Sequence, residues 1–79
     1  MIFIEFTLSD KCTKDYFVGA SYNDVMTDTQ NGTEFGSNSY SSHREITEEE
    51  ARSLKLGFLD EGIEAIQRGC KNFYLNRPI

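Results

Sequence analysis

The first eight residues carry the pattern that most restricts the fold of this chain. Every even position from residue 2 to residue 8 is apolar, whereas Glu5 and Thr7 stand between them at odd positions. An alternation with a period of two residues is typical of a β-strand that buries one face. Phe3 lies on the otherwise polar face, so we expect that face to be partly covered too.

A second strand is predicted at Tyr16–Tyr22, where the alternation returns, and it can be extended through Val25 and Met26. Gly19 weakens this strand and indicates a bulge or a close approach of two backbones. Polar turn residues at 9–15 join it to the first strand.

The segment at about 27–42 is too polar for a central strand. Phe35 and Tyr40 are its only large apolar residues among Ser, Thr, Asn, Gln, Gly and acidic side chains. Its Asn31-Gly32 dipeptide favours a two-residue hairpin turn, because a type I′ turn needs positive φ at both central residues. We therefore predict a polar hairpin arm or loop here, or an edge strand with an exposed tip.

A helix is predicted to begin at Thr47. Residues 47–50 read Thr-Glu-Glu-Glu and match a capping box, in which Thr47 accepts from the amide of Glu50 and the glutamate carboxylate reaches back. The helical pattern runs to Arg68, and Gly69 is a typical C-terminal stop.

The apolar side chains of this helix form two stripes that do not line up. Ala51, Leu54 and Phe58 make the first stripe, and the second begins at Leu59 and is rotated by about a quarter turn. A kink or short break at Gly57 would bring both stripes onto the core. We therefore predict one helix with an irregularity at Gly57, packed across one face of the sheet.

A short apolar and aromatic run at 71–76 predicts a final strand. The expected order is β-β-β-α-β, which gives an α+β fold with a small antiparallel sheet of three to four strands and one helix. Residues 1–79 are expected to form a single compact domain, because two domains would each be too small to close a core.

Charge is distributed unevenly along the chain. Thirteen acids and eight bases give a net charge of −5, which argues against binding of nucleic acid or of an anionic membrane, since both require an excess of Lys and Arg. Eleven acids and three bases lie between Asp15 and Glu64, a balance of −8, against +3 for the two ends together. A surface of one sign attracts basic sites, so we expect a protein partner with a basic surface.

No catalytic, metal-binding or cofactor-binding motif is present in the sequence. His43 is the only histidine, and a dyad with Cys12 or Cys70 depends on geometry that a sequence does not specify. The same three residues lack the spacing of a zinc site. We therefore expect no enzymatic activity, no cofactor and no metal.

No stretch of the chain approaches the ~18 consecutive apolar residues that a membrane span requires. The first residues also lack the basic region of a signal peptide. We expect a cytoplasmic protein whose two cysteines are reduced.

The predicted contact surface combines an acidic helix face with the polar arm. The acids of the helix lie opposite its apolar stripes, and Arg68 is the only base that we expect to balance them. The alternative is a solvated face that keeps a small protein soluble. Phe35 and Tyr40 offer rigid area among adaptable polar side chains, unless both fold back onto the sheet. The predicted contact residues are Asp28, Glu34, Phe35, Tyr40, Glu49, Glu50, Asp60, Glu61 and Glu64.

In size, acidic charge and layout the chain resembles inhibitors that phages and mobile elements encode, anti-CRISPR proteins included. This resemblance implies stoichiometric blocking of a nucleic-acid-handling complex by covering its basic groove. It also implies a location in the host cytoplasm if a phage encodes the chain. Our leading hypothesis is a non-enzymatic protein-binding module that acts by occlusion. The alternative is a small oligomerising structural or accessory subunit that pairs through an exposed edge strand. The sequence leaves open whether the chain is a monomer or a homodimer.

Overall fold

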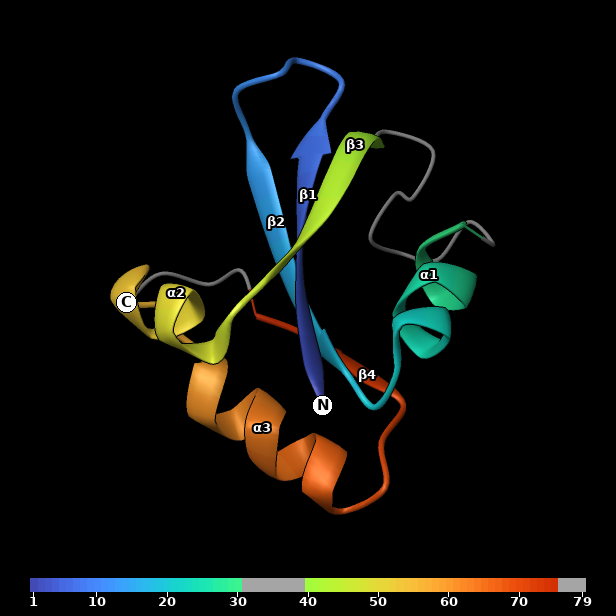
Figure 1. Ribbon diagram of the computed structural model, residues 1–79, viewed down its shortest axis with the longest axis vertical. Helices are drawn as coiled ribbons and strands as arrows, with labels where there is room; N and C mark the ends of the chain where they lie inside the picture. The colour runs from blue at the N-terminus through green and yellow to red at the C-terminus, as the bar shows by residue number, and fades with distance from the viewer. Residues whose placement is uncertain (31–39, 76–79) are drawn as a thin grey trace.

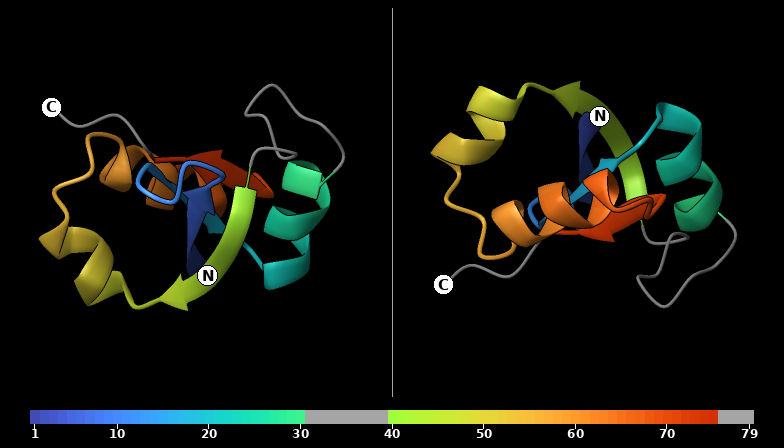
Figure 2. Two further views of the ribbon diagram at one scale, coloured as in Figure 1. Left: turned by 90° about the horizontal axis from the view of Figure 1, so that it is seen from above. Right: turned by 90° about the horizontal axis from the view of Figure 1, so that it is seen from below.

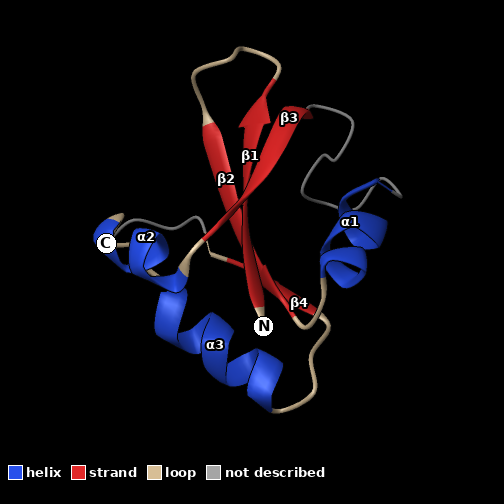
Figure 3. Ribbon diagram, in the orientation of Figure 1, coloured by secondary structure: helices blue, strands red, loops and turns tan. Residues whose placement is uncertain are grey.

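The described part of the chain folds into one four-stranded antiparallel sheet with helices on both faces (Figures 1 and 3). The computed structural model describes residues 1–30 and 40–75, except for the side chains of residues 27–30. The strands are β1 (Ile2–Leu8), β2 (Lys14–Gly19), β3 (Tyr40–Ile46) and β4 (Asn72–Tyr74). The helices are α1 (Tyr22–Gln30), α2 (Glu48–Ser53) and α3 (Leu59–Gln67). The predicted α+β fold with a small antiparallel sheet is therefore confirmed.

β1 lies inside the sheet, whose strand order is β3-β1-β2-β4. Phe3 of β1 stands opposite Val18 of β2 and opposite Ile46 of β3. The four residues from Phe3 to Phe6 are all buried, which requires that both faces of the sheet be covered. The expectation that the face of Phe3 is covered is confirmed.

The two faces of the sheet carry separate apolar cores. On one face, Ala51 of α2 and Ile66 of α3 belong to the same core cluster as Phe3. On the other face, Val25 of α1 belongs to the cluster that contains Ile4. Figure 2 shows α1 on the opposite side of the sheet from α2 and α3. The structure thus has three layers instead of one helix on one face.

α1 occupies residues that we expected to continue the second strand. β2 ends at Gly19. The amide of Asp24 donates to Ser21 Oγ at 3.2 Å, and Ser21 Oγ donates to Asp24 Oδ2 at 3.0 Å. A serine followed three residues later by an acid is a helix-start signal. The prediction of a strand up to residue 22 was wrong because this cap begins a helix, from which Val25 and Met26 reach the core.

The predicted long helix is two helices, α2 and α3, joined by residues 54–58. The capping box is confirmed: the Glu50 amide donates to Thr47 Oγ1 at 3.0 Å, and the Thr47 amide donates to Glu50 Oε1 at 3.2 Å. After Leu54 the chain leaves the helical conformation, because Lys55 has a left-handed backbone with a φ of 55°. We predicted the irregularity at Gly57, but the break begins two residues earlier, at Lys55.

The polar arm predicted at 27–42 lies largely outside the described residues. Its beginning belongs to α1, which ends at Gln30, and its end belongs to β3, which begins at Tyr40. The hairpin turn predicted at Asn31-Gly32 falls outside the described residues. Within the described sheet, β3 is an edge strand that pairs with β1.

α3 approaches the sheet closely at Gly62. A Cβ atom on Gly62 would lie 2.4 Å from Leu75 Cδ2 and 3.0 Å from Val18 Cγ1. Both of these side chains are buried and have little room to move. This contact explains why a glycine occupies the middle of a helix, where it costs about 1 kcal/mol relative to alanine.

We predict that Gly62→Ala lowers the free energy of unfolding by about 1–3 kcal/mol, because overpacking against Leu75 outweighs the gain in helix propensity. Urea denaturation followed by circular dichroism measures the change. Gln67→Ala, at an exposed position of the same helix, is the matched control and should change stability by less than about 0.5 kcal/mol. A Gly62→Ala variant as stable as the wild type would show that this contact is looser than described.

Candidate functional site

Two carboxylates of the central strands are buried on opposite faces of the sheet. Glu5 of β1 and Asp15 of β2 are each 8% exposed. In the register of the two strands, Glu5 stands opposite Tyr16, and Asp15 stands opposite Phe6. A buried carboxylate is costly unless it is hydrogen-bonded or paired. Each of the two is accordingly the centre of a polar cluster.

Tyr16, Arg44 and Lys14 surround Glu5. The Tyr16 hydroxyl donates to Glu5 Oε2 at 2.9 Å, and Arg44 Nε donates to Oε1 at 3.0 Å. Lys14 Nζ lies 3.8 Å from the same Oε1. Burial alone would raise the pKa of Glu5, but these hydrogen bonds and the two positive charges hold that pKa below its ordinary value of 4.5. Burial and the hydrogen bond to Glu5 raise the pKa of Tyr16 to about 12.

Arg44 also connects this cluster to α2. Its Nη1 donates to Glu50 Oε2 at 3.3 Å, while Glu50 closes the capping box with Thr47. The backbone amide of Thr47 and the guanidinium of Arg44 hold the pKa of Glu50 below its ordinary value. Glu50, one of the predicted partner contacts, therefore already has two intramolecular roles.

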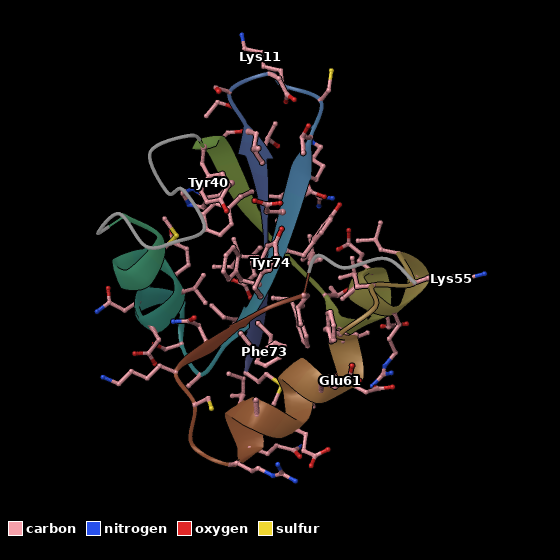
Figure 4. All side chains as sticks on the ribbon, turned by 180° about the vertical axis from the view of Figure 1, so that it is seen from behind. Lys11, Tyr40, Lys55, Glu61, Phe73 and Tyr74 are labelled. Atoms are coloured by element: carbon pink, nitrogen blue, oxygen red, sulfur yellow. The ribbon has the colours of Figure 1, made fainter. Side chains whose placement is uncertain are left out.

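Tyr40 and Tyr74 reach Asp15 from the two edge strands of the sheet (Figure 4). The Tyr40 hydroxyl donates to Asp15 Oδ2 at 2.7 Å, and the Tyr74 hydroxyl donates to Oδ1 at 3.0 Å. The ring of Tyr40 stacks on Phe6 with centroids 4.6 Å apart. Burial and the bond to Asp15 raise the pKa of Tyr40 above its ordinary value of 10. Tyr40, predicted as a partner contact, thus folds back onto the sheet.

His43 lies on the same face of the sheet as Asp15, at an exposed position. Its Nε2 lies 2.6 Å from the hydroxyl of Tyr22, which begins α1. Cys12 and Cys70 are exposed thiols, and within the described residues neither forms a hydrogen bond with His43. The structure therefore gives His43 a tyrosine as its partner, and this contact links β3 to α1.

Arginines pair with several of the acids on α2 and α3. Arg52 Nη2 lies 2.9 Å from Glu48 Oε2, and Arg52 Nη1 lies 3.4 Å from Asp60 Oδ1. Arg52 therefore joins the two helices, whereas Arg68 pairs with Glu64 inside α3. The expectation that Arg68 alone balances this face was wrong, because the break between the helices brings Arg52 to Asp60.

Among the predicted contacts whose side chains are described, Glu49 and Glu61 carry charges that no described side chain pairs. Both are exposed, and neither forms an ion pair with any residue whose side chain is described. Figure 4 shows Glu61 in the first part of α3. Asp28 belongs to α1, but its side chain is outside the described part, as are residues Glu34 and Phe35.

The connection between α2 and α3 exposes two large apolar side chains that we expected in the core. Leu54 is 43% exposed and Phe58 is 40% exposed, whereas Leu56 between them packs against the core. The prediction that Leu54 and Phe58 are buried with Ala51 required the helix to continue without a break after Ala51. The left-handed backbone of Lys55 ends that periodicity, and no periodicity signal in the sequence locates such a turn.

Within the described side chains, no group of three or more His, Cys, Asp or Glu residues is placed to hold a metal ion. None of the helices in the described part combines the length and the hydrophobicity needed to cross a membrane.

Comparisons with protein-family models, with curated proteins and with solved structures found no match. We use the name α2–α3 surface for six exposed residues of α2, of α3 and of the connection between them. They are Glu49, Leu54, Phe58, Asp60, Glu61 and Glu64.

We predict that the stability difference between the wild type and Glu5→Gln depends on pH. Because the folded-state pKa of Glu5 lies below 4.5, its contribution to stability is present above about pH 4.5 and is lost as the pH falls through the folded-state pKa. The difference should be largest near neutral pH and should shrink in acid, as urea titrations at several pH values would measure.

The matched control is Glu61→Gln, which removes an exposed acid that forms no ion pair with a described side chain. It should change the free energy of unfolding by less than about 0.5 kcal/mol at every pH. A stability difference for Glu5→Gln that stays constant from neutral pH to pH 3 would contradict the stabilising role of the ionised carboxylate.

Proposed function

We propose that the chain is a non-enzymatic protein-binding module that recognises a basic surface of a partner protein through the α2–α3 surface. The observation that carries this proposal is that Glu49 and Glu61 are exposed and form no ion pair with any described side chain, on two helices that Arg52 joins. The carboxylates of Glu49 and Glu61 are therefore available to Lys and Arg side chains of a partner. A surface of one sign also speeds association with an oppositely charged protein.

The acids that do form ion pairs remain accessible on the same surface. The side chains of Asp60 and Glu64 are 82% and 57% exposed. Carboxylates this exposed can accept a second cation, so a Lys or Arg of a partner can share Asp60 with Arg52 or Glu64 with Arg68. Residues 48–64 carry six acids and two bases, and this excess favours a basic partner.

The mode of action that we propose is occlusion of a basic, nucleic-acid-handling surface, as in an inhibitor of the phage or mobile-element type such as an anti-CRISPR protein. Carboxylates pair with the same Lys and Arg side chains that neutralise phosphates. A pair of acidic helices can therefore compete with a nucleic acid for its binding groove. Such an inhibitor acts stoichiometrically and needs no catalytic group.

We predict that the double charge reversal E49K/E61K weakens partner binding about tenfold or more, or about 1.4 kcal/mol. The immobilised chain is exposed to native cytosol at low salt, and the captured protein is identified and then titrated against the wild type and the variant. Binding by the wild type should weaken as salt is added. A one-to-one mixture with the chain should also prevent the captured protein from binding its nucleic acid.

Glu45→Lys is the matched control, because Glu45 is an exposed acid on β3 outside the α2–α3 surface. It should leave the affinity unchanged. Equal affinity of the wild type and E49K/E61K for the captured protein, or binding that salt does not weaken, would rule out the electrostatic contact.

Self-assembly through β3 is a second candidate function, and the position of this strand favours it. β3 forms one edge of the described sheet, and its residues from Ser41 to Glu45 are all exposed. The opposite edge, β4, has only three residues. A long exposed edge strand can pair with a second copy in the antiparallel direction, which closes a two-fold dimer.

If β3 mediates self-assembly, we predict that the chain sediments as a dimer at high concentration and dissociates on dilution. Sedimentation velocity across a concentration series measures this. E49K/E61K should not prevent dimer formation, because its substitutions lie outside β3. A chain that stays strictly monomeric at the highest soluble concentration would eliminate this candidate.

A further inference from the structure

We infer that the partner of the α2–α3 surface presents a basic amphipathic segment, in which an apolar side chain is flanked by Lys or Arg. This inference rests on the proposed function and adds an apolar anchor to it. The anchor consists of Leu54 and Phe58, in the connection between α2 and α3.

Two exposed large apolar side chains lie close together in sequence in this connection. Among the described side chains, the exposed large hydrophobic residues are Met1, Tyr22, Leu54 and Phe58. Tyr22 uses its hydroxyl for the contact with His43. Single exposed apolar residues are common on protein surfaces, but Leu54 and Phe58 belong to one short segment that lies between two acidic helices.

The connection is held in a defined shape. Arg52 bridges Glu48 and Asp60 across it. The amide of Lys55 donates to the carbonyl oxygen of Arg52 at 3.2 Å, and Leu56 is fixed against the core. A partner therefore meets a surface that is already ordered, which reduces the entropy that binding has to overcome.

The acids around the anchor determine the kind of partner. Glu61 stands three residues after Phe58, so it lies near that residue along α3. Lys55 is the base of the connection, and Figure 4 shows its side chain pointing outward, away from Glu61. An apolar centre with a charged rim is the usual organisation of a protein interface. Because the rim of this surface is acidic, the partner must present positive charges around its apolar side chain.

A second copy of this chain fits the α2–α3 surface less well than a basic segment. Face-to-face packing of two such surfaces would bring Glu49, Asp60, Glu61 and Glu64 of each copy toward the same acids of the other. Like charges across an interface oppose association. Charge complementarity therefore assigns this surface to a different molecule.

Two fluorescent peptides of equal length and charge test the inference. One is an amphipathic helix of Leu and Lys, and the other has Ala at every Leu position. In fluorescence anisotropy at low salt, the wild-type chain should bind the Leu peptide about tenfold or more tightly than the Ala peptide, because only the former buries apolar area on Leu54 and Phe58. In the variant Leu54→Ser/Phe58→Ser this ratio should fall to about twofold or less.

The controls separate the anchor from the electrostatic contact. Tyr22→Ser, at an exposed apolar residue elsewhere, should keep the ratio of the two affinities, and E49K/E61K should weaken both peptides to a similar extent. The single variants Leu54→Gln and Phe58→Gln should each lower the ratio, and they give a second readout if the double variant folds poorly.

Equal, salt-sensitive binding of the two peptides to the wild type would overturn the anchor and leave the acidic recognition intact. Failure of both peptides to bind at low salt would overturn the proposed function together with the anchor. If the variant Leu54→Ser/Phe58→Ser still prefers the Leu peptide over the Ala peptide as strongly as the wild type does, the apolar contact lies elsewhere on the chain.

Discussion

The structure depends on how two carboxylates are accommodated inside a sheet that is covered on both faces. β1 and β2 form the centre of the sheet, and a central pair of this kind is ordinarily apolar. Glu5 and Asp15 are instead buried there, and each needs hydrogen-bond donors from neighbouring strands. β3 supplies Arg44 and Tyr40, and β4 supplies Tyr74. The edge strands are therefore fixed by side chains as well as by the backbone ladder, and a shift of register would leave a buried charge without its partners.

The cluster around Glu5 also connects the sheet to the acidic helices, whose apolar side chains pack on the core. Arg44 holds Glu5 and Glu50 at the same time, so the beginning of α2 is fixed to the sheet. Arg52 then fixes the beginning of α3 to α2 through Asp60. Each of these arginines uses part of the acidic charge to build the fold. The charge of Glu49 and Glu61 is not used in this way among the described side chains, and it gives the α2–α3 surface its sign.

Local signals in the sequence were sufficient for some elements and not for others. The alternation in residues 2–8 and the capping box at Thr47 each specify one element from a few neighbouring residues, and both predictions were confirmed. α1 was missed because Val25 and Met26 also fit an extended alternation, whereas the cap at Ser21 starts a helix before them. The exposure of Leu54 was missed because it depends on a left-handed residue at Lys55. The bridge from Arg52 depends on the packing of two helices, which a sequence pattern does not contain.

The two candidate surfaces respond to salt in opposite directions, because they involve different charges. Contact of the α2–α3 surface with a basic partner gains Coulomb energy that added salt screens. Self-assembly through β3 brings together two chains that each carry a net charge of −5, so salt screens a repulsion and favours the dimer. β3 leads into α2 through Thr47 alone, and one chain could therefore present both surfaces at once. If both associations occur, low salt would favour the proposed heterologous complex over the proposed dimer, and the charges of Glu49 and Glu61 would decide between them.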